Sequence, residues 1–136
     1  MTTRIVDLIM TLKTRCADRE EKIRKEFSLS PAEYKALITI QEGEFYNCNA
    51  LSQKLGLSVS RASRIIEKLI KGKYLNRKTL KGDRRHIIIS LAPKGMQVQK
   101  EIQKALDECE QVIQNALTKS EINSTYKIFT KLENCL

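Results

Sequence analysis

Apolar side chains recur along much of this chain at steps of three, four or seven residues, the spacing that gathers them on one face of a helix. Residues 3–27 are predicted on this basis to form one long amphipathic helix whose other face is densely charged. A helix of this length cannot bury its stripe on a small domain alone. We therefore expect part of it to meet a partner chain, with packing in a bundle of the same chain as the alternative.

A helix start is also readable at Ser30. Ser30 can cap, Pro31 suits the first helical position, and Glu33 can return a hydrogen bond to the cap. We expect this helix to end near Gly43, with a linker containing Cys48 after it.

Two short helices are predicted next. Asn49 is expected to cap the first, over residues 50–55, and Gly56 to end it in the left-handed conformation. The second begins at Ser58 or Ser60, runs to about Lys71, and should bury one apolar side, made of Val59, Ala62, Ile65, Ile66, Leu69 and Ile70. Its opposite face carries hydroxyls and cations, namely Ser60, Arg61, Ser63, Arg64, Lys68 and Lys71.

Beyond Gly72 the pattern changes to strands over residues 74–80 and 86–91, joined by a turn at residues 81–83. Such a hairpin with a basic tip forms a wing, and a positively charged tip is suited to a minor groove. A plain solvated hairpin is the alternative. Pro93 should open a long helix, and Ser120 with Glu121 a last one.

Charge is distributed very unevenly over these elements. The stretch from Lys54 to Arg85 carries eleven basic and two acidic residues, a net charge of +9, which equals that of the whole 136-residue chain. The other residues balance to zero. A duplex phosphate backbone is the polyanion that such a surface fits, because each neutralised phosphate releases condensed counterions. A solvated basic face is the bland alternative.

Composition argues against several other classes. Four cysteines without CxxC spacing and a single histidine disfavour a zinc site or a disulfide framework. The chain has no Gly-rich phosphate loop and no Ser/His/Asp set, so we expect no enzyme and no cofactor. No apolar run is long enough for a bilayer, and residues 1–10 make a poor signal peptide, so we expect a cytoplasmic protein without a membrane partner.

Two stretches resemble the MarR family of winged helix-turn-helix transcription regulators. GDRRHIIISLAPKG is similar to the family's wing signature, with Asp83 and Arg85 in the Asp-x-Arg positions and Gly95 as the final glycine. LSQKLGLSVSRASRIIEKLIKGKYLNR is similar to its paired DNA-binding helices. At Ala92 the chain departs from the pattern, which has a threonine there. This removes a helix cap worth about 1 kcal/mol.

The resemblance implies a mainly α fold with a small β-hairpin wing. Residues 1–28 would be an N-terminal dimerisation helix, 29–95 the DNA-binding lobe, and 96–136 the C-terminal dimerisation helices. The protein would be a homodimeric repressor that binds double-stranded DNA at a pseudo-palindromic operator and is released by an effector.

Roles in DNA binding follow from the same resemblance. Four residues would probe bases: Ser60, Arg61, Ser63 and Arg64. Phosphates would be held by Lys54, Lys68, Lys71 and Arg77. Either Arg84 or Arg85 would enter the minor groove, with Asp83 orienting it through a charge-assisted bond.

The resemblance implies that the effector would be either a small molecule or an oxidant. One branch of the family senses small aromatic anions, and another, the peroxide-sensing OhrR proteins, oxidises a cysteine. Cys16 lies on the apolar stripe of the first predicted helix, as such sensors' cysteines do, with a small buried apolar side chain as the alternative. Cys48 is the second candidate. The competing function is a winged-helix module that docks RNA or protein without effector control, although RNA readers usually expose stacking aromatics.

Overall fold

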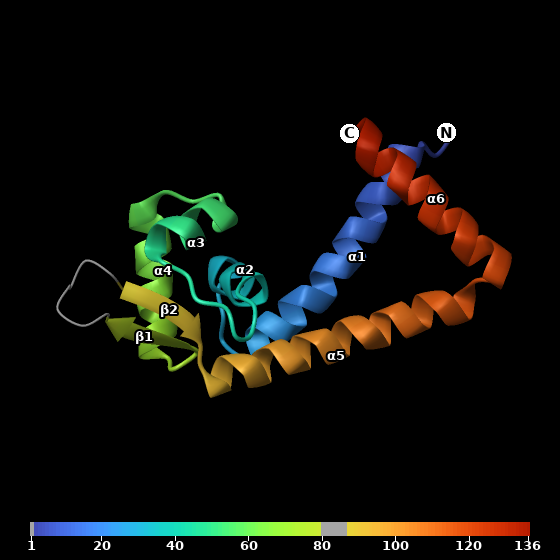
Figure 1. Cartoon of the computed structure of the whole chain (residues 1–136). Helices are drawn as coiled ribbons and strands as arrows, with labels where there is room; N and C mark the ends of the chain where they lie inside the picture. Colours follow the sequence, from blue (N-terminus) through green and yellow to red (C-terminus); the bar gives the residue numbers. More distant parts are fainter. Residues whose placement is uncertain (1, 80–86) are drawn as a thin grey trace. The chain divides into compact units, whose positions relative to one another are not determined.

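The computed structural model describes residues 2–79 and 87–136 (Figure 1). The described elements are α1 (Ile5–Glu26), α2 (Pro31–Thr39), α3 (Cys48–Leu55), α4 (Val59–Lys71), β1 (Leu75–Thr79), β2 (Ile87–Leu91), α5 (Pro93–Ala116) and α6 (Lys119–Cys135). They fall into two compact units, Met1–Gln99 and Lys100–Leu136. The predicted fold class, mainly α with a small antiparallel hairpin, is confirmed.

Helix α1 closely matches its predicted span. Asp7 in its first turn accepts hydrogen bonds from the side chain and backbone of Arg4, which hold the pKa of the Asp7 carboxyl below its ordinary value. The helix buries none of its residues within the chain.

Helix α2 starts as predicted and ends early. The Ser30 and Glu33 side chains form the reciprocal cap. The helix stops at Thr39 rather than near Gly43, because Ile40 is already extended. The side-chain amide of Gln99 donates to the carbonyls of Leu37 and Ile40, so it satisfies groups that a longer helix would have used.

The start of α3 corrects another prediction. Asn47, not Asn49, is the cap, and its side chain accepts a 2.7 Å hydrogen bond from the Ala50 N–H. Cys48 is therefore the first residue of a helix rather than part of a linker. Gly56 ends α3 with φ = +65°, the predicted left-handed conformation.

Helix α4 begins after Ser58, whose hydroxyl accepts from the Arg61 N–H at 3.3 Å. This settles the choice between Ser58 and Ser60. The inner face carries the buried residues Ala62, Ile66 and Leu69. Val59 was predicted to be buried and is half exposed, because it lies in the first turn beyond the packed part of the helix.

The hairpin pairs β1 with β2, from Leu75 opposite Leu91 to Thr79 opposite Ile87. Its turn lies outside the described residues. Tyr46 extends this small sheet by exchanging both backbone hydrogen bonds with Ile89. The core of the first unit lies between these strands, α2, α3, α4 and the start of α5. Its largest fully buried side chains are Leu37, Ile40, Leu51, Leu55, Leu69, Leu75, Ile89 and Val98.

Gly95 is required where α5 leaves the hairpin, because a Cβ there would collide with the Tyr74 carbonyl oxygen. Pro93 opens α5 as predicted. The Ala92 side chain cannot cap the helix, but its backbone N–H donates to the same Tyr74 carbonyl at 3.0 Å.

In the second unit, α6 begins earlier than predicted. Thr118 caps it and forms the reciprocal box with Glu121, so Ser120 lies inside the first turn. None of the α6 residues is buried. None of the described helices is long and apolar enough to cross a membrane.

Candidate nucleic-acid interface

The outer face of α4 carries a row of cations. Arg61, Arg64, Lys68 and Lys71 follow one another at steps of three, four and three residues, which places them on one side of the helix. All four are exposed, as is Ser60, whereas Ser63 is half-buried. The structure thus brings together the predicted base-reading and phosphate-holding residues of this helix.

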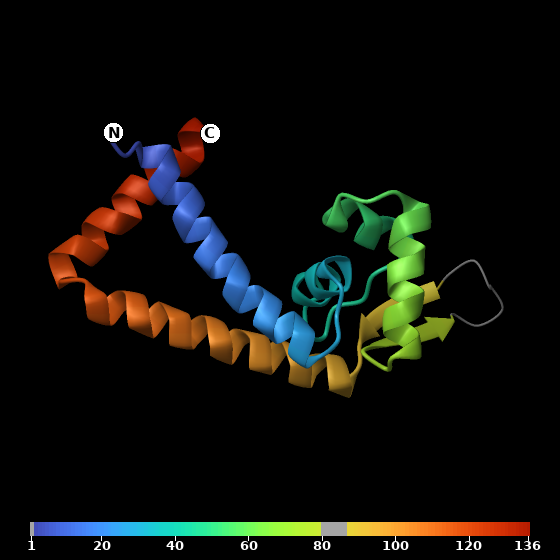
Figure 2. The ribbon, with the colours of Figure 1, turned by 180° about the vertical axis from the view of Figure 1, so that it is seen from behind.

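Packing fixes the opposite face of α4. The helix contacts α2, α3 and β1 within the same unit, and Figure 2 shows it standing between α3 and the hairpin. A site on a helix whose other side is buried keeps its geometry better than one on a loop. The first turns of α4 therefore present their side chains at defined positions.

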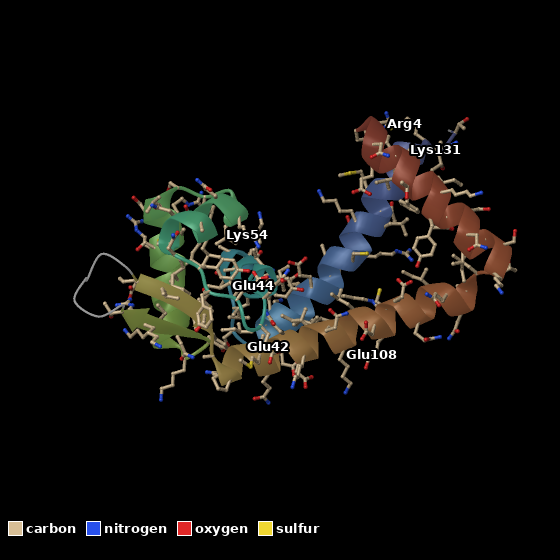
Figure 3. All side chains as sticks on the ribbon, in the orientation of Figure 1. Arg4, Glu42, Glu44, Lys54, Glu108 and Lys131 are labelled. Carbon is tan, nitrogen blue, oxygen red and sulfur yellow. The ribbon has the colours of Figure 1, made fainter. Side chains whose placement is uncertain are left out.

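Lys54, a predicted phosphate contact, lies in the last turn of α3. Its ammonium lies 3.5 Å from the Tyr46 hydroxyl and 5.0 Å from the centre of that ring. The hydroxyl in turn donates to the Glu44 carboxylate. Figure 3 labels Glu44 and Lys54 on their two segments. Sequence reasoning missed both Glu44 and Tyr46, because neither lies in a recognisable motif.

Arg77 is not a free cation. Its guanidinium forms an ion pair with Glu67, which joins β1 to α4. The pair borders an open hollow that is also lined by Lys68, Ile70 and Lys71. The prediction that Arg77 holds a phosphate is untested, and this pairing gives the side chain a second, structural contact.

The remaining candidates lie elsewhere. Asp83, Arg84 and Arg85 lie outside the described residues. Cys16 is exposed on α1, so the chain itself does not bury it as filler. Cys48 is half-buried in the first turn of α3 rather than in the predicted linker. Within the described part of the chain, no cluster of His, Cys, Asp and Glu could hold a metal ion.

The sequence model of the MarR family matches residues 29–87, the stretch that contains α2 to the start of β2. The chain thus contains a MarR-family domain over this stretch. It is accordingly a DNA-binding transcription regulator with a winged helix, and the family is one of regulators rather than enzymes.

Relatives extend the likeness beyond this lobe. The transcriptional repressor MprA of Escherichia coli K12 is 27% identical over 127 residues, which are 92% of this chain and 72% of MprA. A mutant of MepR from S. aureus superposes with a TM-score of 0.83 at 16% identity, over 98% of each chain. Another MepR mutant, solved bound to an oligodeoxyribonucleotide, gives a TM-score of 0.75 at 15% identity, over 98% of this chain and 99% of the mutant. These MarR-fold structures support the fold of the whole chain.

Proposed function

We propose that this MarR-family protein is a homodimeric repressor that binds a pseudo-palindromic operator and is released by a small-molecule or oxidative signal. The observation that carries the DNA-binding part is the exposed cationic face of α4 on a helix held by its buried side. Repression is supported by the likeness to MprA, and DNA binding by the likeness to the MepR mutant bound to an oligodeoxyribonucleotide. Because the ligand would be genomic DNA, we also propose a cytoplasmic location.

The proposed DNA contacts fall into groups according to the part of the DNA that each side chain can reach. Side chains in the first turns of a recognition helix reach base edges, so Ser60, Arg61, Ser63 and Arg64 would read sequence. Lys54, Lys68, Lys71 and Arg77 would hold phosphates. The wing residues Asp83, Arg84 and Arg85 would serve the adjacent minor groove.

Dimerisation is proposed from the apolar surface that the single chain leaves uncovered. Helix α1 exposes more than half of Ile5, Leu8 and Leu12, and α6 does the same with Tyr126 and Ile128. Exposed apolar surface of this extent marks an interaction site. A second copy of the chain is the partner we propose for this surface, because a protein that binds two symmetric half-sites is usually a two-fold dimer. We therefore keep residues 1–28 and 96–136 as the dimerisation segments and 29–95 as the DNA-binding lobe.

Binding can be tested with inverted repeats found upstream of the protein's own gene or of a divergent neighbour. Gel shifts should show salt-dependent binding to such a duplex that exceeds binding to a scrambled duplex and to structured RNA. Sedimentation at micromolar concentration should give a dimer. Equal binding to duplex DNA and RNA would favour the docking-module alternative.

Oxidative release is proposed from Cys16, which is exposed on the helix that we assign to the dimer interface. Peroxide should weaken operator binding of the wild type and not of Cys16→Ser. Cys48→Ser is the matched control, because it removes a thiol from the DNA-binding lobe. A response that persists in Cys16→Ser and disappears in Cys48→Ser would transfer the role to Cys48. A response unchanged in both variants would point to Cys109 or Cys135. No response of the wild type to peroxide would favour a small-molecule effector.

A further inference from the structure

Tyr46 is held in place from two directions. The residue as a whole is only 7% exposed. Its N–H donates to the Ile89 carbonyl at 2.9 Å, and its carbonyl accepts from the Ile89 N–H at 2.7 Å. The next residue, Asn47, caps α3. The ring is therefore anchored both to the hairpin strand β2 and to the helix that carries Lys54.

The direction of the hydrogen bonds around its hydroxyl follows from the chemistry of the partners. An ionised carboxylate only accepts and an ammonium only donates. The hydroxyl must therefore donate to the Glu44 Oε2, 2.5 Å away, and accept from the Lys54 Nζ, 3.5 Å away. Glu44 thus fixes the hydroxyl proton, which leaves the oxygen lone pairs for Lys54.

The arrangement restrains Lys54 without neutralising it by a direct contact. Lys54 remains exposed, and its ammonium lies over the Tyr46 ring at 5.0 Å from the centroid, a distance at which the ring face attracts a cation. Among the ion pairs of the described residues, none joins Glu44 to Lys54. A lysine stem has many rotamers, and restraining them before binding reduces the entropy lost on meeting a phosphate.

We propose that Tyr46, oriented by Glu44, is a positioning residue that holds the Lys54 ammonium ready for a phosphate of the DNA backbone. This inference rests on the proposed DNA-binding function. It adds Glu44 and Tyr46, which lie outside the helix-turn-helix motif, to the residues that set affinity. The opposite role, in which the tyrosine withdraws the lysine from DNA, is an outcome of the test.

A double-mutant cycle on a scrambled duplex separates these roles, since a phosphate contact does not depend on sequence. Lys54→Ala should weaken binding by about fivefold or more and flatten the salt dependence by about one ion. Tyr46→Phe keeps the ring and should weaken binding by about two- to fivefold, the scale of one hydrogen bond. Adding Tyr46→Phe to Lys54→Ala should cause no further loss.

Tyr74→Phe is the matched control. Tyr74 also lies beneath a lysine, Lys94 at 4.4 Å from the ring centre, but that lysine is outside the proposed interface. Its hydroxyl deletion should leave DNA affinity unchanged. Thermal unfolding of all variants identifies any that lose the fold.

A second pair of variants tests the orienting carboxylate. Glu44→Ala and Glu42→Ala remove the same charge from the same loop, so both lessen repulsion of DNA, and Glu44→Ala also removes the acceptor of the hydroxyl proton. Glu44→Ala should bind more weakly than Glu42→Ala, because only Glu44 accepts from the Tyr46 hydroxyl. This comparison still tests whether Tyr46 positions Lys54 if the Tyr46→Phe variant is unstable.

The outcomes separate the two levels of the proposal. If Tyr46→Phe binds DNA more tightly than the wild type, the tyrosine withdraws the lysine from DNA. If Tyr46→Phe lowers DNA affinity by the same factor in the wild type and in Lys54→Ala, the tyrosine acts only on the structure. Either result overturns the positioning role and leaves DNA binding intact. Failure of the wild type to bind any duplex would overturn the proposed function itself.

Discussion

Helices α4 and α1 are both amphipathic, but they use their two faces differently. Helix α4 buries its apolar side in the first unit and turns a row of arginines and lysines outward. Helix α1 is longer, yet none of its residues is buried, and its apolar stripe is exposed beside mixed charges. The apolar side of α4 is covered within one chain, whereas the apolar stripe of α1 stays exposed among the described residues.

The sign of the charge separates the partners that the two surfaces suit. All the excess positive charge lies between Lys54 and Arg85, and the rest of the chain is neutral. A face of one sign repels another copy of itself and attracts a polyanion. A neutral apolar face does not repel another copy of itself and offers a polyanion no net charge. DNA binding and self-association are therefore assigned to different segments of one chain.

The largest effect is expected from disrupting self-association. Phe129, half exposed on α6, is proposed to lie in the dimer interface. Phe129→Glu should give a monomer, and operator affinity should fall by about 100-fold or more, since two linked half-site contacts gain roughly 10²–10⁴ from effective concentration. Sedimentation and titration of the operator check both effects.

Lys131→Glu is the control for the added negative charge, because it changes a charged residue on the same helix (Figure 3). It should remain dimeric and lose little affinity. If Phe129→Glu also remains a dimer with full affinity, the apolar face of α6 has another purpose.

The next largest effect is expected from α4, where different residues are proposed to contact bases and phosphates. Arg64→Ala should cost roughly 1–3 kcal/mol on the operator and little on scrambled duplex, because a base contact is lost. Lys68→Ala should weaken binding to both duplexes alike and reduce the salt slope by about one ion. Salt titrations of both variants on both duplexes measure the difference.

Reversed behaviour would overturn this assignment. If Arg64→Ala loses affinity equally on both duplexes while Lys68→Ala loses it on the operator alone, sequence is read nearer the C-terminal end of α4.

Local patterns predicted most of the fold. The reciprocal cap at Ser30, the left-handed Gly56 and the hairpin after Gly72 all depend on nearest neighbours, and the structure confirms them. The wrong caps at Asn49 and Ser120 had local signals too. Each lies two residues after the residue that caps, which is Asn47 for α3 and Thr118 for α6. For α6 the sequence also shows the Thr-x-x-Glu spacing of a capping box, from Thr118 to Glu121.

Long-range contacts could not be predicted in the same way. Helix α2 ends early beside Gln99, and Tyr46 pairs with Ile89, and both partners are more than forty residues away in the chain. The stripe on α4 was visible as charge, but the pairing of Arg77 with Glu67 depends on how β1 packs on α4. The sequence therefore predicted which cationic residues share the exposed face of α4, but it did not predict that Arg77 pairs with Glu67.

The smallest effect is expected at the start of α6, which is distant in sequence from the proposed DNA contacts. Thr118→Ala should lower stability by roughly 1 kcal/mol, the usual value of such a cap. Ser120→Ala, at the position predicted from sequence, should have almost no effect. Urea unfolding of the dimer compares the two, and equal losses would refute the cap at Thr118.

The contribution of the Glu121 carboxylate to this cap should depend on pH. Hydrogen bonds from the Thr118 backbone, and secondarily from its side chain, lower the pKa of the Glu121 carboxyl. A carboxyl whose pKa is lower in the folded state contributes stability above its unfolded pKa and loses it as the pH falls through the folded pKa. Glu121→Gln should therefore be less stable than the wild type at neutral pH, and the difference should narrow on acidification. A difference that stays constant with pH would show that the charge on Glu121 does not contribute to the cap.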